Sequence, residues 1–496
     1  MSNASTSAYL RTAAAALALS VAFALLLAIP LARADDAAPA VAGSVTEVVD
    51  ALVTEALRAN LELEASGKTV AERLAALDAA RARYLPVLDF NARYTAASGG
   101  RTVDIPVGDL LNPVYSTLNQ LTGSSRFPQV ANQTIDLQRP REQDTHLSLT
   151  QPLYDARVAA ARAGAAAEFD AATANHRALA AQVERDTRNA YYRWLEARAQ
   201  AEILNATLDL ARENERVNAS LFRNGKITRD LVFRAEADVL EVEQSLLAAR
   251  NAVRLAQSYV DLLRNVDQAT PLPLARADES DLREMKRALA ARLGNGRFAL
   301  EPLQAAALGR RPELEQLDAE TAAARAGERA ARAAFKPQLA LAVDAGTQGV
   351  GYGLTSDDRY VLASLVLRFN LFSGGADEAG LSGAHERRRA AELGRGVAEQ
   401  RIRLEVQQAL QDLEVAEASL DTAAKRVEAA AGAFRIAERK RDLGQINQAE
   451  FVDARRALTD AQLNLNVTRF TALGSLAQLE YALGAGRRAQ TPEVQP

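Results

Sequence analysis

The sequence contains no cysteine, only one tryptophan and three histidines, and aromatic residues make up 5% of its 496 residues. Without cysteine the chain can form no disulfide, no thiolate metal site and no lipid-modified N-terminal cysteine. The three histidines, His146, His176 and His385, lie far apart and show no ligand spacing with a carboxylate. We therefore expect no metal site and no other cofactor.

Motifs for nucleotide or covalent chemistry are also missing. The glycine-rich run at 349–353 lies between expected strands and lacks the helix that a dinucleotide fingerprint needs. Ser373-Gly374-Gly375 precedes a helix, but no P-loop lysine follows it, and the chain has no G-x-S-x-G elbow. The arginine run at 387–389 has acidic residues nearby, which is typical of a solvated helix surface. The sequence thus predicts a protein that is not an enzyme and binds no nucleic acid.

Proline is absent from residues 153–270 and 338–491, so nothing in either stretch forces a helix to break. Each stretch is interpreted as a long helix, a turn at Gly225 or Gly444, and a returning helix. The expected helices are 156–223 and 229–265 in the first stretch, and 376–443 and 448–483 in the second. A continuous helix of the longer kind extends about 100 Å at 1.5 Å per residue. That length is greater than the diameter of a compact domain.

Alternating apolar and polar residues predict four short strands. In residues 87–97, Leu88 and Phe90 share one face and Asp89 lies on the other. The segment 99–143 is rich in Gly, Pro, Asn, Ser and Thr, and we expect a long exposed loop there. The remaining strands are expected at about 145–152, 338–346 and 360–370.

The flanking segments complete the expected organisation. Residues 1–34 hold one early cation, an apolar run and the pattern Ala32-Arg33-Ala34, which together predict a cleaved signal peptide. A membrane anchor is the alternative for this run. Residues 45–83 have a helical pattern with a break expected around Ser66-Gly67. We expect a linker with short helical pieces at 270–311 and a flexible tail at 485–496.

The second half of the chain repeats the first. Pro337 corresponds to Pro86, Leu371-Phe372 to Leu153-Tyr154, and Gly444 to Gly225. Residues 35–269 are therefore the first strand-hairpin and helix-hairpin repeat, and residues 312–484 are the second.

Strands of about 8 to 11 residues can cross a bilayer core when they are tilted. Four strands cannot close, and open sheet edges are not tolerated in lipid, so several chains would have to join into one barrel. Two copies would give about eight strands with a filled interior, whereas three would give about twelve and leave room for a duct. The pattern favours a homotrimer. The alternative is that these strands are edge hairpins of a soluble helical protein.

The sequence resembles the outer membrane efflux protein family of TolC-like channels, from about Val45 to Gly484. The resemblance is carried by residues 149–155 (LTQPLYD), 371–375 (LFSGG), 311–314 (RPEL) and by Tyr191-Tyr192. It implies a mainly α fold with a transmembrane β-barrel portion. It further implies a homotrimer with a 12-stranded barrel in the outer membrane lipid of a Gram-negative bacterium, a periplasmic tunnel of 12 helices, and a belt around 270–311.

The function implied by this resemblance is a passive exit duct of a tripartite efflux or type I secretion system, opened at its periplasmic helical tip. The implied partners are a periplasmic adaptor (membrane fusion protein) and an inner-membrane ABC or proton-driven transporter. A periplasmic helical coiled-coil scaffold or adaptor protein is the alternative from another functional class.

The resemblance also implies functional residues at the tips. Glu450 and Asp453 match the acids that form a cation ring at the periplasmic gate. The alternative is that both simply favour the positive N-terminal end of a helix. In the first repeat the equivalent position is Leu231, so only the neighbouring Asp230 is available as a gate acid. The tip turns expected to contact the adaptor are Gly225, Ile227, Gly444 and Ile446.

Overall fold

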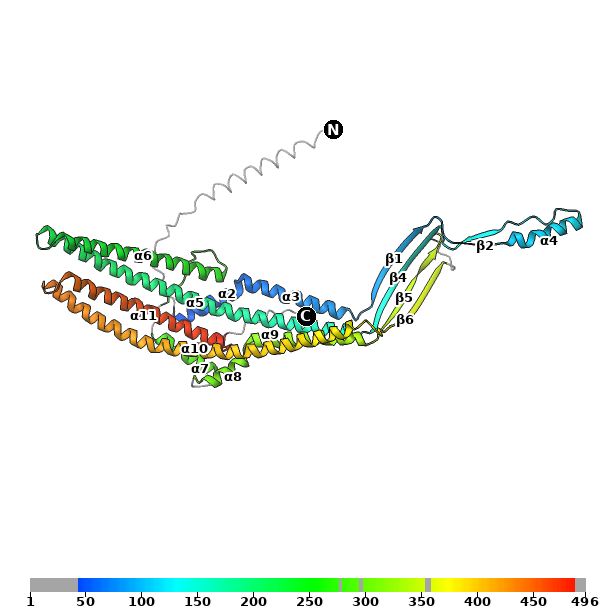
Figure 1. Ribbon diagram of the computed structural model, residues 1–496. Helices are drawn as coiled ribbons and strands as arrows, with labels where there is room; N and C mark the ends of the chain where they lie inside the picture. Colours follow the sequence, from blue (N-terminus) through cyan, green and yellow to red (C-terminus); the bar gives the residue numbers. More distant parts are fainter. Residues whose placement is uncertain (1–42, 276–278, 294–297, 353–357, 487–496) are drawn as a thin grey trace, which may run out of the picture.

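The computed structural model describes residues 43–275, 279–293, 298–352 and 358–486, so the predicted signal peptide and most of the predicted tail lie outside the described residues. The molecule is elongated and mainly helical (Figure 1). Long helices form one end, a sheet of four strands follows, and a small arm projects beyond the sheet (Figure 1).

Two helical hairpins build the long end. In the first, α5 (Ala156–Arg223) packs along α6 (Arg229–Arg264), and in the second, α10 (Ala376–Asp442) packs along α11 (Gln448–Ala482). The carboxylate of Asp155 accepts a hydrogen bond of 2.8 Å from the Arg157 amide and so caps α5. Proline-free sequence thus allows helices of 68 and 67 residues.

The helical segment before the first strand breaks earlier than the sequence predicted. The break lies at Asn60, between α2 (Val45–Ala59) and α3 (Leu61–Ala82), and not around Ser66-Gly67. The Asn60 side chain accepts from the Leu63 amide and thereby caps α3. A glycine inside a helix costs only about 1 kcal/mol, and the packing of α3 on α5 offsets this cost.

The segment after α6 forms two short helices, α7 (Glu279–Leu293) and α8 (Leu300–Leu308), which are followed by α9 (Pro312–Arg332) and the 3₁₀ turn η1 (Ala333–Phe335). The largest apolar core lies where these helices meet α2, α5, α10 and α11. Tyr191 is fully buried there, and its hydroxyl donates to the Pro273 carbonyl at 2.7 Å. Burial raises the pKa of Tyr191 to about 12, so the phenol stays protonated.

The sheet has the order β1 (Val87–Ala96), β4 (Arg141–Tyr154), β5 (Gln338–Gly349), β6 (Arg359–Arg368), and every neighbouring pair is antiparallel. β1 and β6 are its outer strands. β1 and β4 come from the first half of the chain and β5 and β6 from the second, and β4 joins the two pairs by pairing with β5.

The strand register separates apolar and polar residues onto opposite faces of the sheet. Directly paired residues lie on the same face. One such row is Leu88, Leu149, Val343 and Ala363, and the next row in β1 and β4 pairs Phe90 with Leu147. The opposite face carries the rows Asp89, Ser148, Asp344, Leu362 and Asn91, His146, Gly346, Tyr360. The apolar face lies open in the single chain, with Phe90 70% exposed.

The expectation of an irregular loop over 99–143 is wrong. This segment forms an arm made of β2 (Thr102–Ile105), α4 (Val107–Thr122) and β3 (Gln133–Asp136), with β2 paired to β3. The helix persists although it contains Pro113, which removes one backbone hydrogen bond. Asparagines in this segment form side-chain bonds that hold the helix in place, and their turn-like composition concealed it.

Candidate functional site

The two hairpins end in turns of the same geometry. Gly225 and Gly444 have φ angles of +70° and +69°, a backbone conformation that favours glycine. The Gly225 amide donates to the Phe222 carbonyl at 2.9 Å, and the Gly444 amide donates to Arg441 at the same distance. Ile227 and Ile446 follow these turns and are half-buried. The predicted tip residues therefore lie at the end of the molecule far from the sheet (Figure 1).

The predicted gate acids occupy the first turns of α11. Glu450 and Asp453 are both exposed and lie three residues apart, so they share one face of the helix. Asn447 caps the helix by accepting from the Glu450 amide at 2.9 Å. Asp230 belongs to the other hairpin, where its carboxylate accepts a short hydrogen bond from the Thr228 hydroxyl. Within one chain the acids of the two tips thus belong to different hairpins.

A buried ion pair joins the two hairpins behind these tips. Arg455 of α11 donates two hydrogen bonds to the carboxylate of Asp238 in α6, at 2.7 and 2.8 Å. Arg455 is 2% exposed and Asp238 is 5% exposed. Arg456 extends the link by pairing with Glu241 at 2.7 Å. The bridge lies about two to three helical turns from the starts of α6 and α11.

The remaining contacts between the first hairpin and α11 include a series of polar links. The hydroxyls of Thr207 and Thr459 lie 3.1 Å apart, and the Asn466 amide donates to the Glu196 carbonyl at 2.8 Å. We call this series, together with the Asp238–Arg455 pair, the polar seam.

Each hairpin, in contrast, holds itself together with apolar side chains. Leu204, Leu208, Val239 and Val242 form a buried cluster between α5 and α6. In the second hairpin, the rings of Phe434 and Phe451 lie 5.7 Å apart. Apolar burial is non-directional, whereas a buried ion pair holds only in one geometry. Near the tips the hairpins are thus linked mainly by directional polar contacts, with Leu463 of α11 packed against the first hairpin's cluster, whereas the apolar core described above joins them farther from the tips.

Sequence reasoning did not single out Asp238 or Arg455. Charged residues make up 25% of the chain, and both residues lie within helices that carry many other charges. Burial is the property that distinguishes them, and it depends on which helix faces pack together. Burial lowers the pKa of Arg455, while Asp238 acts in the opposite direction and favours the charged form.

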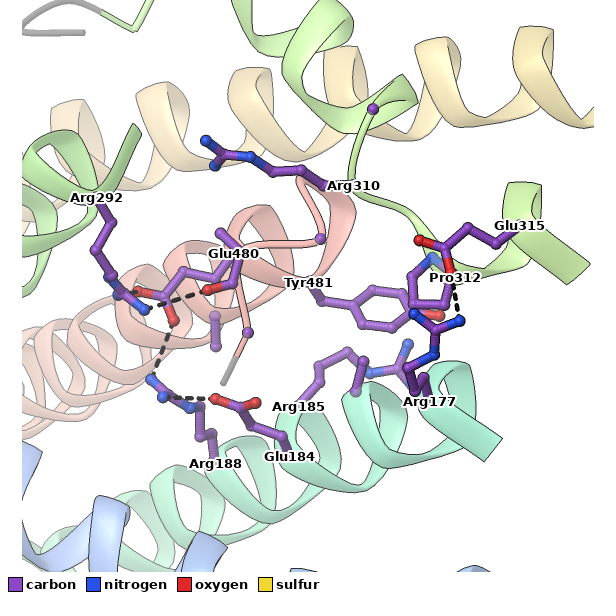
Figure 2. Close-up of a pocket in the computed structure, with 16 residues that line it drawn as sticks. Arg177, Glu184, Arg185, Arg188, Arg292, Arg310, Pro312, Glu315, Glu480 and Tyr481 are labelled. Carbon is purple, nitrogen blue, oxygen red and sulfur yellow. Dashed lines mark hydrogen bonds and ion pairs between the residues drawn. The ribbon is translucent and has the colours of Figure 1, made fainter. Parts of the chain in front are cut away.

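A second polar cluster surrounds a cavity of about 640 Å³ where α5, α11 and the start of α9 meet (Figure 2). Arg188 donates to Glu184 at 2.9 Å and to Glu480 at 3.1 Å, and Arg292 reaches Glu480 at 2.6 Å. Burial alone would lower the pKa of Arg188, but the carboxylates of Glu480 and Glu184 outweigh it, so the pKa is raised. Because these charged groups are paired with one another, the cluster connects α7 and α11 to α5.

The described residues contain no group of three or more histidine and acidic side chains that could hold a metal ion. None of the described helices combines the length and the apolar character needed to cross a membrane.

Comparison with known proteins assigns the chain to a family. The family model described as outer membrane efflux protein matches residues 52–264 and 303–485, which includes both helical hairpins. Among curated relatives, the toluene efflux pump outer membrane protein TtgC and the antibiotic efflux pump outer membrane protein ArpC, both from Pseudomonas putida, are 25% identical over 323 residues. These matches cover 62% of this chain and 61% of each relative, so the chain spans about three fifths of their length.

Solved structures share the fold. CusC matches with a TM-score of 0.73 and 18% identity over 89% of this chain and 92% of that chain. The CmeC outer membrane channel of Campylobacter jejuni matches with a TM-score of 0.73 and 16% identity, and the match covers 90% of this chain and 87% of that chain. The scaffold or adaptor alternative receives no support from these comparisons. The resemblance noted in the sequence is therefore confirmed, and the chain belongs to the outer membrane efflux protein family.

Proposed function

We propose that this protein is the outer-membrane exit duct of a tripartite efflux or type I secretion system, formed by three copies of the chain and opened at its periplasmic helical tips. The observation that carries the proposal is the sheet. Its register places an apolar face opposite a polar face, although neither face is covered within one chain. A lipid-facing exterior and a water-filled interior require this division.

The edges of the sheet support an assembly of several chains. β1 and β6 are outer strands, and unpaired backbone groups are not tolerated in a bilayer. Joining β6 of one copy to β1 of the next satisfies both edges by one repeated contact around an axis. Three copies supply twelve strands, enough to leave an open interior, whereas two supply eight and would fill it.

The polar face of the sheet is suited to line such a duct. Asp144 accepts from the Tyr360 hydroxyl at 3.2 Å and lies 3.0 Å from a ring nitrogen of His146. Asp144 and His146 thus interact within β4, Tyr360 reaches Asp144 from β6 across β5, and the side chains of Asp144 and His146 remain partly exposed. Three copies of the two hairpins would then continue the duct as a tunnel of twelve helices.

The polar seam gives the proposed gate its mechanism. In the closed state, Asp238 and Arg455 hold α11 against the first hairpin, and the exposed face with Glu450 and Asp453 turns toward the axis. Three copies would bring six carboxylates together there, where their mutual repulsion favours bound cations. Opening breaks the seam and moves the second hairpin outward without unfolding it.

The proposed partners follow from where the tips lie. The turns at Gly225 and Gly444, with Ile227 and Ile446, form an end surface that would contact a periplasmic adaptor. The energy for transport would come from an inner-membrane ABC or proton-driven transporter, since the sequence carries no nucleotide-binding motif.

Membrane fractionation tests this function. The protein is expected to pellet with the outer membrane and to migrate on a denaturing gel as a heat-sensitive trimer. Reconstitution of the purified trimer in planar bilayers is expected to give cation-blocked channels. A monomer in the soluble periplasmic fraction would refute the proposal.

A further inference from the structure

The arm at the end of the sheet holds its helix with the apolar side turned outward. Leu110, Val114 and Leu121 recur at helical spacing on α4, and they are 70%, 54% and 78% exposed. A helix that packs on its own chain normally buries such a face. Here the same end of the molecule also exposes Val103 and Ile135, which are paired in β2 and β3.

The polar side of α4 is the one that contacts the rest of the arm. Asn112 donates to the Val130 carbonyl at 2.9 Å and accepts from the Val130 amide at 2.7 Å. Asn119 makes the same two-way contact with the backbone of Phe127, at 2.7 and 3.0 Å. These paired hydrogen bonds fix the rotation of the helix about its own axis and thereby hold its apolar face outward.

The start of the helix reinforces this orientation. Gly108 lies so close to the returning chain that a Cβ atom there would come within 2.3 Å of the Val130 carbonyl oxygen. Any other residue would push α4 away and disrupt its asparagine contacts. A two-stranded ribbon with one helix is marginal in water by itself. The exposed apolar face therefore needs a partner surface.

The charge of α4 identifies that partner. Helices that lie on a lipid surface carry lysine and arginine on their polar face. The only charged residue of α4 is Asp109, and Asn132 donates to its carboxylate at 3.0 Å. The helix thus lacks the cations that would attract it to anionic headgroups, and its face is complementary to an equally uncharged apolar surface.

We infer that the α4 helices of neighbouring copies pack against one another through the face formed by Leu110, Val114 and Leu121, and so tie the copies together at the outer rim of the sheet. This inference rests on the proposed trimer. The arm leaves from the ends of β1 and β4, and β1 is the edge strand at which the next copy would join. Symmetry would therefore bring identical arms to the same end of the assembly.

Single cysteines in the full-length chain test this contact, because the natural sequence has none. Leu110→Cys and Leu121→Cys lie on the apolar face at opposite ends of α4, and Gln120→Cys is the control at an exposed position outside that face. Oxidation in intact outer membranes is expected to give covalent dimers from at least one apolar-face variant and none from the control. A charged maleimide should also label the apolar-face cysteines more slowly than the control.

The outcomes separate the possible occupants. Absence of dimers together with labelling as fast as the control would mean an uncovered face and would overturn the inference. If no dimers form and the apolar-face cysteines are protected from the maleimide in membranes but not in detergent, the face contacts lipid, and this result would also overturn the inference. The heat-sensitive trimer is measured in the same samples. Its persistence without dimers refutes the arm contact alone, whereas its absence from the wild type refutes the proposed trimer as well.

Discussion

Removing the carboxylate of Asp238 is the sharpest perturbation of the polar seam. Asp238→Ala leaves the buried guanidinium of Arg455 without its two strongest hydrogen bonds. The remaining acceptor is the Thr207 carbonyl at 3.5 Å, which is a weak partner. The closed state is destabilised because Arg455 stays buried there, whereas opening returns it to water.

The size of the effect follows from burial. Removing one partner of a buried ion pair typically costs about 3–5 kcal/mol. The seam lies close to the tip, so water can reach it more easily than a domain core, and the lower value of roughly 3 kcal/mol applies. Since each 1.4 kcal/mol changes an equilibrium tenfold, the ratio of open to closed tips should rise on the order of 100-fold.

Single-channel recording in planar bilayers measures this ratio as open probability. Arg212→Ala is the matched control, because it removes an exposed pair with Glu243 within the first hairpin. Exposed pairs contribute about 0–1 kcal/mol, so the control should change the ratio less than tenfold. The double variant Asp238→Leu with Arg455→Met should restore closure, since apolar residues of similar size can replace a buried pair.

Two results would refute this reasoning. The first is an open probability for Asp238→Ala that equals that of the Arg212→Ala control. The second is a double variant that stays as open as Asp238→Ala, which would mean that the buried charge is not the cause of opening.

Three further predictions concern other residues. Replacing Glu450 and Asp453 with Ala should weaken the block of the channel by divalent cations, whereas Asp230→Ala should leave it unchanged, and equal block in all variants would rule out the assigned cation ring. Burial lowers the pKa of His176, so as pH falls the unfolded chain binds a proton at this histidine before the folded chain does. The free energy of unfolding should therefore not depend on this histidine above about pH 6.5 and should decrease below it. His176→Gln should flatten this decline in thermal unfolding at pH 7.5 and 5.5, and an unchanged slope would exclude His176 as its source. Gly444→Ala should destabilise the second hairpin by about 1 kcal/mol in denaturant unfolding, because a residue with a Cβ atom is strained at a φ of +69°. Steric clashes do not contribute, since no atom lies within 4 Å of the added Cβ, and a stabilised variant would contradict this prediction.

The helices and strands could be predicted because their signals are local. The absence of proline indicated the long helices, and the alternation around Phe90 indicated which residues share a face of the sheet. The arm was missed because Asn112 and Asn119 belong to residue types that favour turns, yet here they bind the backbone of a returning segment. Asn60 was missed for a related reason, since the capping bond to Leu63 shows only in the folded chain.

The candidate site could be predicted only in part. Gly225 and Gly444 were recognisable because a glycine after a long helix indicates a left-handed cap. Asp238 and Arg455 were not, because their pairing joins helices that are more than two hundred residues apart in the sequence. No periodicity within one helix specifies such a contact.

The most direct measurement of the central claim is whether β1 of one copy meets β6 of another. Ala92→Cys in β1 and Ala363→Cys in β6 both lie on the apolar face of the sheet. In outer membranes treated with a short bifunctional maleimide, the double variant should form covalent trimers and nothing larger, and each single variant should remain monomeric after denaturation. Monomers from the double variant, or a ladder that continues beyond the trimer, would contradict a closed barrel of three chains.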